Sequence, residues 1–154
     1  MAKEAQVYEF TLERIVDASP ETTFEEMLDP KAQLEWWGGD GDIVRATCDL
    51  RVGGTATIEW GPSEATLIRT DQVFREIERP RRVVYAETVR QIGFPVYECL
   101  LTFELASVRD KTRVTLHHTG FPSPEQRDLH AHGTGIFFDR LAKHLERAKK
   151  PRPA

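Results

Sequence analysis

Three places in this chain combine a helix-capping residue with proline: Ser19-Pro20, Asp29-Pro30 and Ser123-Pro124. Ser and Asp side chains accept hydrogen bonds from free N–H groups at the start of a helix, and proline suits the first helical position. The third continues as Glu125-Gln126, which also fits a capping box. About 80 residues between the second and third show strand-like patterning without a comparable helix start. The predicted order is therefore a strand, two short helices, a series of strands and one long C-terminal helix.

The strand-like segments alternate apolar and polar residues. We expect strands at 8–16, 43–50, 55–60, 65–77, 82–88, 97–105 and 112–119. The adjacent glycines Gly53-Gly54 indicate the turn of a hairpin. The segment 65–77 is long for one strand, so we expect a bend or bulge near Thr70-Asp71.

The final helix, 124–149, determines how the sheet is covered. At about 100° per residue, one broad face gathers small and apolar side chains: Leu129, Gly133, Ile136, Phe137, Leu141, Leu145 and Ala148. Such a wide arc is typical of a helix that lies in a concave sheet. His130 and Thr134 fall within the same arc, and His130 is either a core histidine with a local partner or a ligand contact. We therefore predict an α+β fold in which a curved antiparallel sheet encloses a cavity beneath this helix.

Composition limits the function classes. The chain has 154 residues, which suits a single domain (1–154, with an ordered core of about 8–148), and its formal charge of −4 argues against a nucleic-acid partner. No segment resembles a signal peptide or a membrane span, so a cytoplasmic location is expected and no membrane partner. Cys48 and Cys99 are expected to be buried small side chains, with a disulfide or a reactive thiol as the alternative.

No metal site or catalytic signature is predicted. His117 and His118 are adjacent on a strand, so their rings point to opposite faces. His130 and His132 diverge by about 200° on a helix. The chain lacks a nucleophile elbow, a phosphate-binding loop and a dinucleotide fingerprint. We expect neither a metal nor a cofactor.

Several motifs occur in the order seen in a known family: RIVDASP at 14–20, LEWW at 34–37, DLRVGG at 49–54, EIERPRRVVY at 76–85, TRVTLHH at 112–118 and His130-x-x-Gly133. With them the chain resembles the START-like superfamily, also called Bet v 1-like or SRPBCC. Within it, the chain is similar to the branch named after the C-terminal domain of the activator of Hsp90 ATPase. The resemblance implies a helix-grip fold, β-αα-β6-α, with seven strands wrapped around the last helix.

One residue departs from that resemblance. The family commonly has Gly-Trp in the last helix, where this chain has Gly133-Thr134. A threonine in place of a large ring is expected to open or polarise the space between helix and sheet. The fold itself hosts binders, enzymes and co-chaperones, so it does not decide among them.

Alternation along the fifth predicted strand places Val83, Tyr85 and Glu87 on one face. If that face is inward, Glu87 lies near the mouth of the cavity, where its pKa would be raised and it could act as a general acid or base. The alternative is that Glu87 meets water or an arginine at the rim and has only a structural role. The residues expected to contact a ligand are Trp37, Trp60, Tyr85, Glu87, Phe103, His130, Thr134, Phe137 and Leu141, with Glu87 and His130 as the candidate catalytic groups.

Apolar walls with a few polar groups suit a small hydrophobic or aromatic ligand. Binding of such a ligand is the first functional hypothesis. The second is an enzyme of cyclase or hydrolase type acting on such a ligand. The third, implied by the resemblance alone, is a partner of an Hsp90-type chaperone. A homodimer is left open.

Overall fold

The computed structural model describes residues 7–149, and its elements follow the predicted order. The strands are β1 (Tyr8–Val16), β2 (Ile43–Cys48), β3 (Thr55–Gly61), β4 (Ile68–Glu78), β5 (Arg82–Arg90), β6 (Glu98–Val108) and β7 (Lys111–Phe121). The helices are α1 (Pro20–Leu28), α2 (Pro30–Trp36) and α3 (Pro124–Lys149), with one 3₁₀ turn at Glu64–Thr66. No helix within the described residues is long and apolar enough to cross a membrane.

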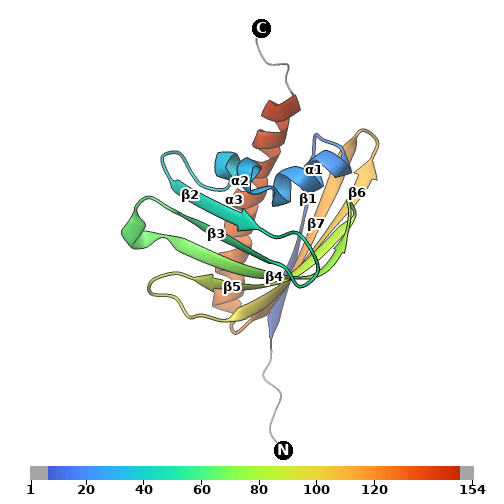
Figure 1. Cartoon of the computed structure of the whole chain (residues 1–154). Helices are drawn as coiled ribbons and strands as arrows, with labels where there is room; N and C mark the ends of the chain where they lie inside the picture. Colours follow the sequence, from blue (N-terminus) through green and yellow to red (C-terminus); the bar gives the residue numbers. More distant parts are fainter. Residues whose placement is uncertain (1–6, 150–154) are drawn as a thin grey trace, which may run out of the picture.

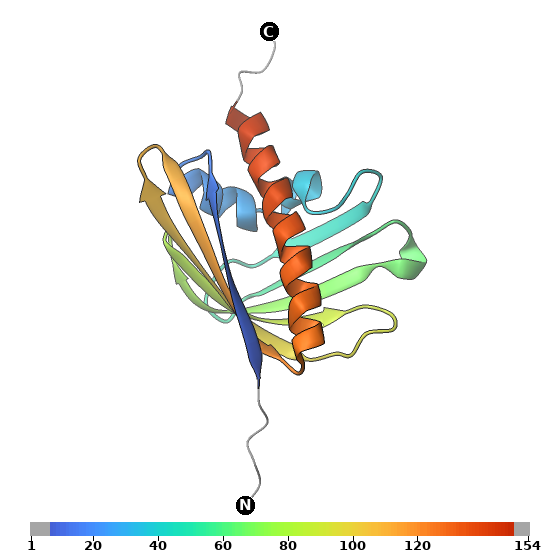
Figure 2. The same ribbon diagram turned by 180° about the vertical axis from the view of Figure 1, so that it is seen from behind.

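The seven strands form one antiparallel sheet in the order β1-β7-β6-β5-β4-β3-β2. The sheet is strongly curved, and α3 crosses its concave side (Figure 1). Seen from behind, α1 and α2 lie near the C-terminal half of α3, whereas the N-terminal half spans the hollow of the sheet (Figure 2). The predicted α+β helix-grip arrangement is confirmed.

All three predicted capping residues begin helices. Ser19 Oγ accepts a hydrogen bond from Thr22 N at 3.2 Å, Asp29 Oδ1 accepts one from Lys31 N at 3.0 Å, and Ser123 Oγ accepts one from Gln126 N at 3.2 Å. The reciprocal bond of a capping box is not found among the described residues, so this detail of the prediction is wrong. Gln126 Oε1 instead accepts from the hydroxyl of Tyr97 at 3.2 Å, which ties the start of α3 to the sheet.

The predicted irregularity in the fourth strand is real, but its predicted place is wrong. The segment after Ser63 begins with a 3₁₀ turn, and β4 then pairs with β3 without a break through Thr70 and Asp71. The register shift with β5 lies between Phe74 and Glu76. Up to Phe74, the side chains of β4 that point inward have even residue numbers. Beyond the bulge the odd-numbered Ile77 packs against the core. The bulge thus allows both side chains to face inward.

Helix α3 buries only two residues of the predicted arc, Leu141 and Leu145. Its buried side chains are Phe138, Leu141, His144 and Leu145, whereas Ala148 is exposed. Leu129 and Ile136 keep 53% and 41% of their surface exposed. The physical reason is that only the C-terminal half of α3 is covered by α1 and α2, while the N-terminal half faces open space.

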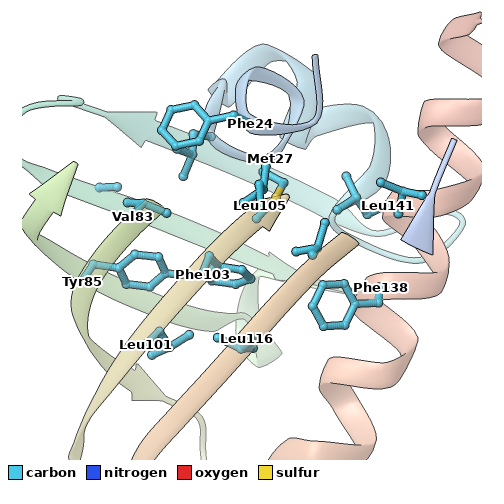
Figure 3. Packing of buried hydrophobic residues seen from close by; sticks show 14 of the residues in the cluster. Phe24, Met27, Val83, Tyr85, Leu101, Phe103, Leu105, Leu116, Phe138 and Leu141 are labelled. Atoms are coloured by element: carbon cyan, nitrogen blue, oxygen red, sulfur yellow. The ribbon is translucent and has the colours of Figure 1, made fainter. Parts of the chain in front are cut away.

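The hydrophobic core lies where the C-terminal half of α3, helix α1 and strands β5–β7 meet. Figure 3 shows Phe138 and Leu141 of α3 near Phe103 and Leu105 of the sheet, with Met27 of α1 above them. Ion pairs link the helix to the first strand and to the residue that follows it: Arg14 Nη2 lies 2.7 Å from Asp139 Oδ1, and Lys149 Nζ lies 2.8 Å from Asp17 Oδ1. Each exposed pair contributes little, about 0–1 kcal/mol, so apolar packing holds α3 in place.

Candidate ligand-binding cavity

A cavity of about 410 Å³ lies between the N-terminal half of α3 and the concave face of the sheet. Strands β3 to β7 form its floor, and the loop between β5 and β6 borders its mouth. Most of its wall is apolar: Trp37, Trp60, Ile68, Tyr85, Val89, Phe94, Leu101, Phe103, Leu116, Leu129, Gly133, Ile136 and Phe137. The polar lining consists of Thr70, Glu87, Gln91, His118, Gln126, His130, Thr134 and Arg140.

Three large rings form one wall. Trp37 meets Trp60 edge-on, with ring centroids 5.6 Å apart, and meets Phe137 edge-on at 4.9 Å. Trp36 packs behind them at 4.9 Å from Phe137, and its Nε1 donates to the carbonyl oxygen of Glu26 at 3.0 Å. Such edge-to-face pairs hold each ring in a defined orientation. The wall is therefore largely preformed.

The floor comes from alternate residues of the strands. Tyr85 and Phe103 lie side by side on neighbouring strands with ring centroids 6.0 Å apart, and Leu101 and Leu116 lie next to them (Figure 3). On α3, a methyl group at Gly133 would meet no atom within 4 Å. Gly133 and Thr134 therefore border open space at the point where the family commonly has a large ring.

Glu87 lies inside the cavity. It is 7% exposed, and its Oε1 accepts a hydrogen bond from Gln72 Nε2 at 3.2 Å. Burial raises its pKa to about 7, although the Gln72 hydrogen bond opposes that shift. Glu87 forms no ion pair with an arginine among the described residues, and its hydrogen-bond partner is Gln72. At neutral pH this carboxyl group can both take up and release a proton.

Besides Glu87, the cavity lining contains a pair of histidines, His118 and His130. His118 is 3% exposed, and neither of its ring nitrogens has a hydrogen-bond partner among the described residues. Its ring packs 4.6 Å from Phe121 and 5.8 Å from His130. Burial, with smaller contributions from His130 and His117, lowers its pKa to about 3, and burial also lowers the pKa of His130. His118 is therefore a neutral imidazole at physiological pH.

One further polar atom on the floor lacks a partner. Thr70 Oγ1 is buried and forms no hydrogen bond within the described residues. A buried polar atom left unpaired costs about 1–3 kcal/mol. Thr70 and His118 line the cavity, but their unpaired polar atoms themselves have almost no accessible surface.

The structure brings together eight of the nine residues expected to contact a ligand: Trp37, Trp60, Tyr85, Glu87, Phe103, His130, Thr134 and Phe137. Leu141 does not line the cavity, because it is fully buried in the core beside Phe138. Sequence reasoning missed His118 and Thr70. Their signal was present in the alternation of the strands, since His118 shares an inward face with Leu116 and Thr70 shares one with Gln72.

The predicted divergence of His117 and His118 is confirmed. His117 lies on the outer face, with Nε2 3.0 Å from Glu9 Oε2, whereas His118 faces the cavity. Residues 7–149 contain no group of three or more His, Cys, Asp or Glu side chains placed to hold a metal ion. Cys99 is buried, Cys48 is partly buried, and both are free thiols.

A second hollow lies between α1, α2 and the C-terminal part of α3. It measures about 600 Å³, and its lining is mostly charged and contains no Phe, Tyr or Trp. His144 Nε2 lies 3.2 Å from Glu26 Oε2, and its Nδ1 lies 3.7 Å from Glu35 Oε2. This groove has the polar surface of a helix junction, unlike the mostly apolar lining of the cavity beneath α3.

A family model described as activator of Hsp90 ATPase homolog 1-like protein matches residues 17–146. The chain belongs to this family. The match covers every element from α1 to β7 and most of α3, so the cavity lies within the family domain. No match is found among curated proteins.

Solved structures share the fold. Mll3558 of Rhizobium loti is 27% identical, with a TM-score of 0.78, over 91% of this chain and 98% of that chain. CV1439 of Chromobacterium violaceum is 22% identical, with a TM-score of 0.76, over 90% and 96%. DynU16, a protein in the dynemicin biosynthetic locus, is 17% identical, with a TM-score of 0.72, over 92% of this chain and 48% of that chain. The likeness to CV1439 and to DynU16 shows that the three proteins share a fold, and it says nothing about function.

Proposed function

We propose that this protein binds a small hydrophobic or aromatic molecule in the cavity between the sheet and α3. The observation that carries the proposal is a cavity of about 410 Å³ with a preformed aromatic wall and few polar groups. Ligand pockets typically measure about 300–1,000 Å³ and have this kind of lining. Leu129 and Ile136, both substantially exposed, border the cavity and would lose contact with water when a ligand enters.

A neutral fluorescent probe, N-phenyl-1-naphthylamine, tests the proposal. Its emission should rise on saturable binding to one site. Thr134→Trp places a large ring on the cavity wall, so we expect it to weaken probe binding at least about tenfold. Lys143→Trp adds the same ring on the exposed side of α3, and we expect it to leave binding unchanged.

Two outcomes would contradict the proposal. One is a probe signal that does not saturate in the wild-type protein. The other is equal weakening by Thr134→Trp and Lys143→Trp, which would place the probe elsewhere or indicate general destabilisation. Thermal unfolding of both variants serves as the control for folding.

One observation favours a second candidate, an enzyme acting on such a ligand. Glu87 is buried in the cavity with a pKa of about 7, which suits a general acid or base at neutral pH. A bicyclic ketone, 2-tetralone, provides a probe, because a base can remove an α-proton that solvent deuterium then replaces. If Glu87 is that base, Glu87→Gln abolishes protein-catalysed exchange and Glu98→Gln, at an exposed site, retains it. Exchange that persists in Glu87→Gln would remove Glu87 from the reaction.

Association with an Hsp90-type chaperone stays a prediction from the family resemblance. The homodimer and the cytoplasmic location also stay predictions. A pull-down with the purified chaperone that recovers none of this protein would dispose of the chaperone hypothesis.

A further inference from the structure

Exposed apolar side chains gather around the mouth of the cavity. The described residues include eleven large apolar side chains that are exposed, and five of them belong to two elements that border this mouth. Three lie in the loop between β5 and β6, namely Ile92, Phe94 and Val96, which are 77%, 45% and 54% exposed. The other two, Leu129 and Ile136, lie in the N-terminal half of α3. We call these five residues the apolar rim.

A tight turn sets the direction of the loop. Phe94 N donates a hydrogen bond to the carbonyl oxygen of Gln91 at 3.1 Å, and Gly93 has a φ of 85°. A positive φ at the third residue of a four-residue turn is typical of a type II turn, where glycine is preferred. Every residue from 91 to 96 is exposed. Ile92 therefore lies at the tip of a preformed loop, so little entropy is lost when a partner contacts it.

The helical part of the rim contains a notch. Leu129, Gly133 and Ile136 follow one another at spacings of four and three residues, so they form one stripe along α3. Gly133 is exposed, and a methyl group added to it would meet no atom within 4 Å. A side chain from outside can therefore fill the gap between Leu129 and Ile136. The loop and this end of α3 lie at the same end of the molecule, away from α1 and α2 (Figure 1 and Figure 2).

The size and charge of the rim limit what can cover it. The five exposed fractions correspond to on the order of 500 Å² of apolar surface, as large as the largest patch on a typical monomer. Two such patches pressed together would bury about 1,000 Å², the lower limit for a specific protein interface. Residues 91–97 carry no charge, and Arg127 at the start of α3 is paired with Asp128 at 3.0 Å. Anionic membranes attract surface clusters of Lys and Arg, whereas this loop has none and the chain has a formal charge of −4.

We infer that two copies of this chain associate through the apolar rim, with Ile92 of each copy in the Gly133 notch of the other. Such a reciprocal contact is the arrangement of a two-fold symmetric dimer. Each loop then lies across the partner's cavity mouth, because Leu129 and Ile136 border both the notch and the cavity. An interface of this size gives a weak dimer with a dissociation constant in the micromolar range, so dilute solutions contain the monomer. Association does not depend on a bound ligand and is separate from the proposed function.

Sedimentation velocity between about 5 µM and about 500 µM measures this association, and the wild-type protein should shift from monomer towards dimer over that range. Ile92→Asp and Leu129→Asp each add a charge to the rim, one on the loop and one on the helix. Each should raise the dissociation constant at least about tenfold, because the contact would bury an unpaired charge. Val52→Asp is the matched control: Val52 is 64% exposed in the turn between β2 and β3, so the same added charge should leave association unchanged. Circular dichroism verifies that all three variants fold.

A dilution series of amide NMR spectra locates the contact without any substitution. The signals of residues 91–96 and 129–136 should move with protein concentration, because these residues enter the interface. The signals of residues 50–54, around the control position, should stay fixed. Movement confined to other parts of the sheet would place the contact elsewhere and overturn the inference.

Three further results would overturn the dimer. One is a wild-type protein that stays monomeric up to about 500 µM. Another is a dimer that survives both Ile92→Asp and Leu129→Asp, or that Val52→Asp weakens equally. The third comes from flotation with phosphatidylcholine vesicles: a monomer that floats with them, while Ile92→Asp does not, would make the rim a membrane-binding surface. If the dimer forms as expected and N-phenyl-1-naphthylamine does not bind, the proposed function alone fails.

Discussion

Replacing Leu141 with alanine is expected to lower the free energy of unfolding by about 2–5 kcal/mol. Leu141 is fully buried, and the core around it includes Phe138 and Leu145 of the same helix. Truncation removes apolar contacts and leaves a void that close-packed neighbours fill only in part. Urea denaturation of the variant and the wild-type protein measures the difference.

Leu129→Ala is the matched control on the same helix. Leu129 keeps 53% of its surface exposed and lies at the cavity, so we expect a change within about 0.5 kcal/mol. The contrast tests the assignment of Leu141 to the core and of Leu129 to the cavity. Equal destabilisation by the two substitutions would show that α3 packs on the sheet along its whole length.

The second large effect is on the pH dependence of stability, because two buried groups in the cavity act in opposite directions. Glu87 has a folded-state pKa of about 7 against an ordinary 4.5, so the folded state holds its proton more tightly. Its contribution is present below pH 4.5 and is lost as pH rises through 7. His118 has a folded-state pKa of about 3 against 6.5, so the unfolded state holds that proton more tightly. Its contribution is present above pH 6.5 and is lost as pH falls towards 3.

The two slopes, each about 1.4 kcal/mol per pH unit, cancel between about pH 4.5 and 6.5. A variant that removes one of the two groups should therefore reveal the pH dependence that the other group contributes. Relative to wild type, Glu87→Gln should become more stable as pH rises through this window, by on the order of 3 kcal/mol in total. His118→Phe should change in the opposite direction by a similar amount. Urea midpoints measured at half-unit pH intervals give both slopes.

Val52→Ala, at an exposed position without a titratable group, is the control and should run parallel to the wild-type curve. Parallel curves for Glu87→Gln and the wild-type protein would contradict the burial of this carboxyl in the cavity. A flat difference for His118→Phe would likewise show that water or a partner reaches its ring.

The element order could be predicted because local chemistry determined it. Ser19, Asp29 and Ser123 each cap a helix through their own side chains, and no distant contact is needed for that. The bulge in β4 was misplaced for the opposite reason. Its position depends on whether Phe74 and Ile77 both reach the core, which only the packed sheet decides.

The aromatic part of the cavity was predicted better than its polar part. In a small fold with one concave face, large rings such as Trp60 and Phe137 can be buried at few sites other than that face. A buried polar residue carries no such signal, since Thr70 and His118 are ordinary on a half-exposed strand. Their inward direction follows from strand register, whereas their lack of a hydrogen-bond partner follows from packing across three strands and α3. Leu141 was assigned to the cavity because helical periodicity gives a face but not what covers it.

A crystal structure grown with N-phenyl-1-naphthylamine tests the central claim most directly. The account predicts electron density for the probe between the N-terminal half of α3 and strands β3–β7, in contact with Trp60, Phe103 and Phe137. A structure in which α3 is pressed onto the sheet, with side chains filling the 410 Å³ and no probe beneath the helix, would contradict it.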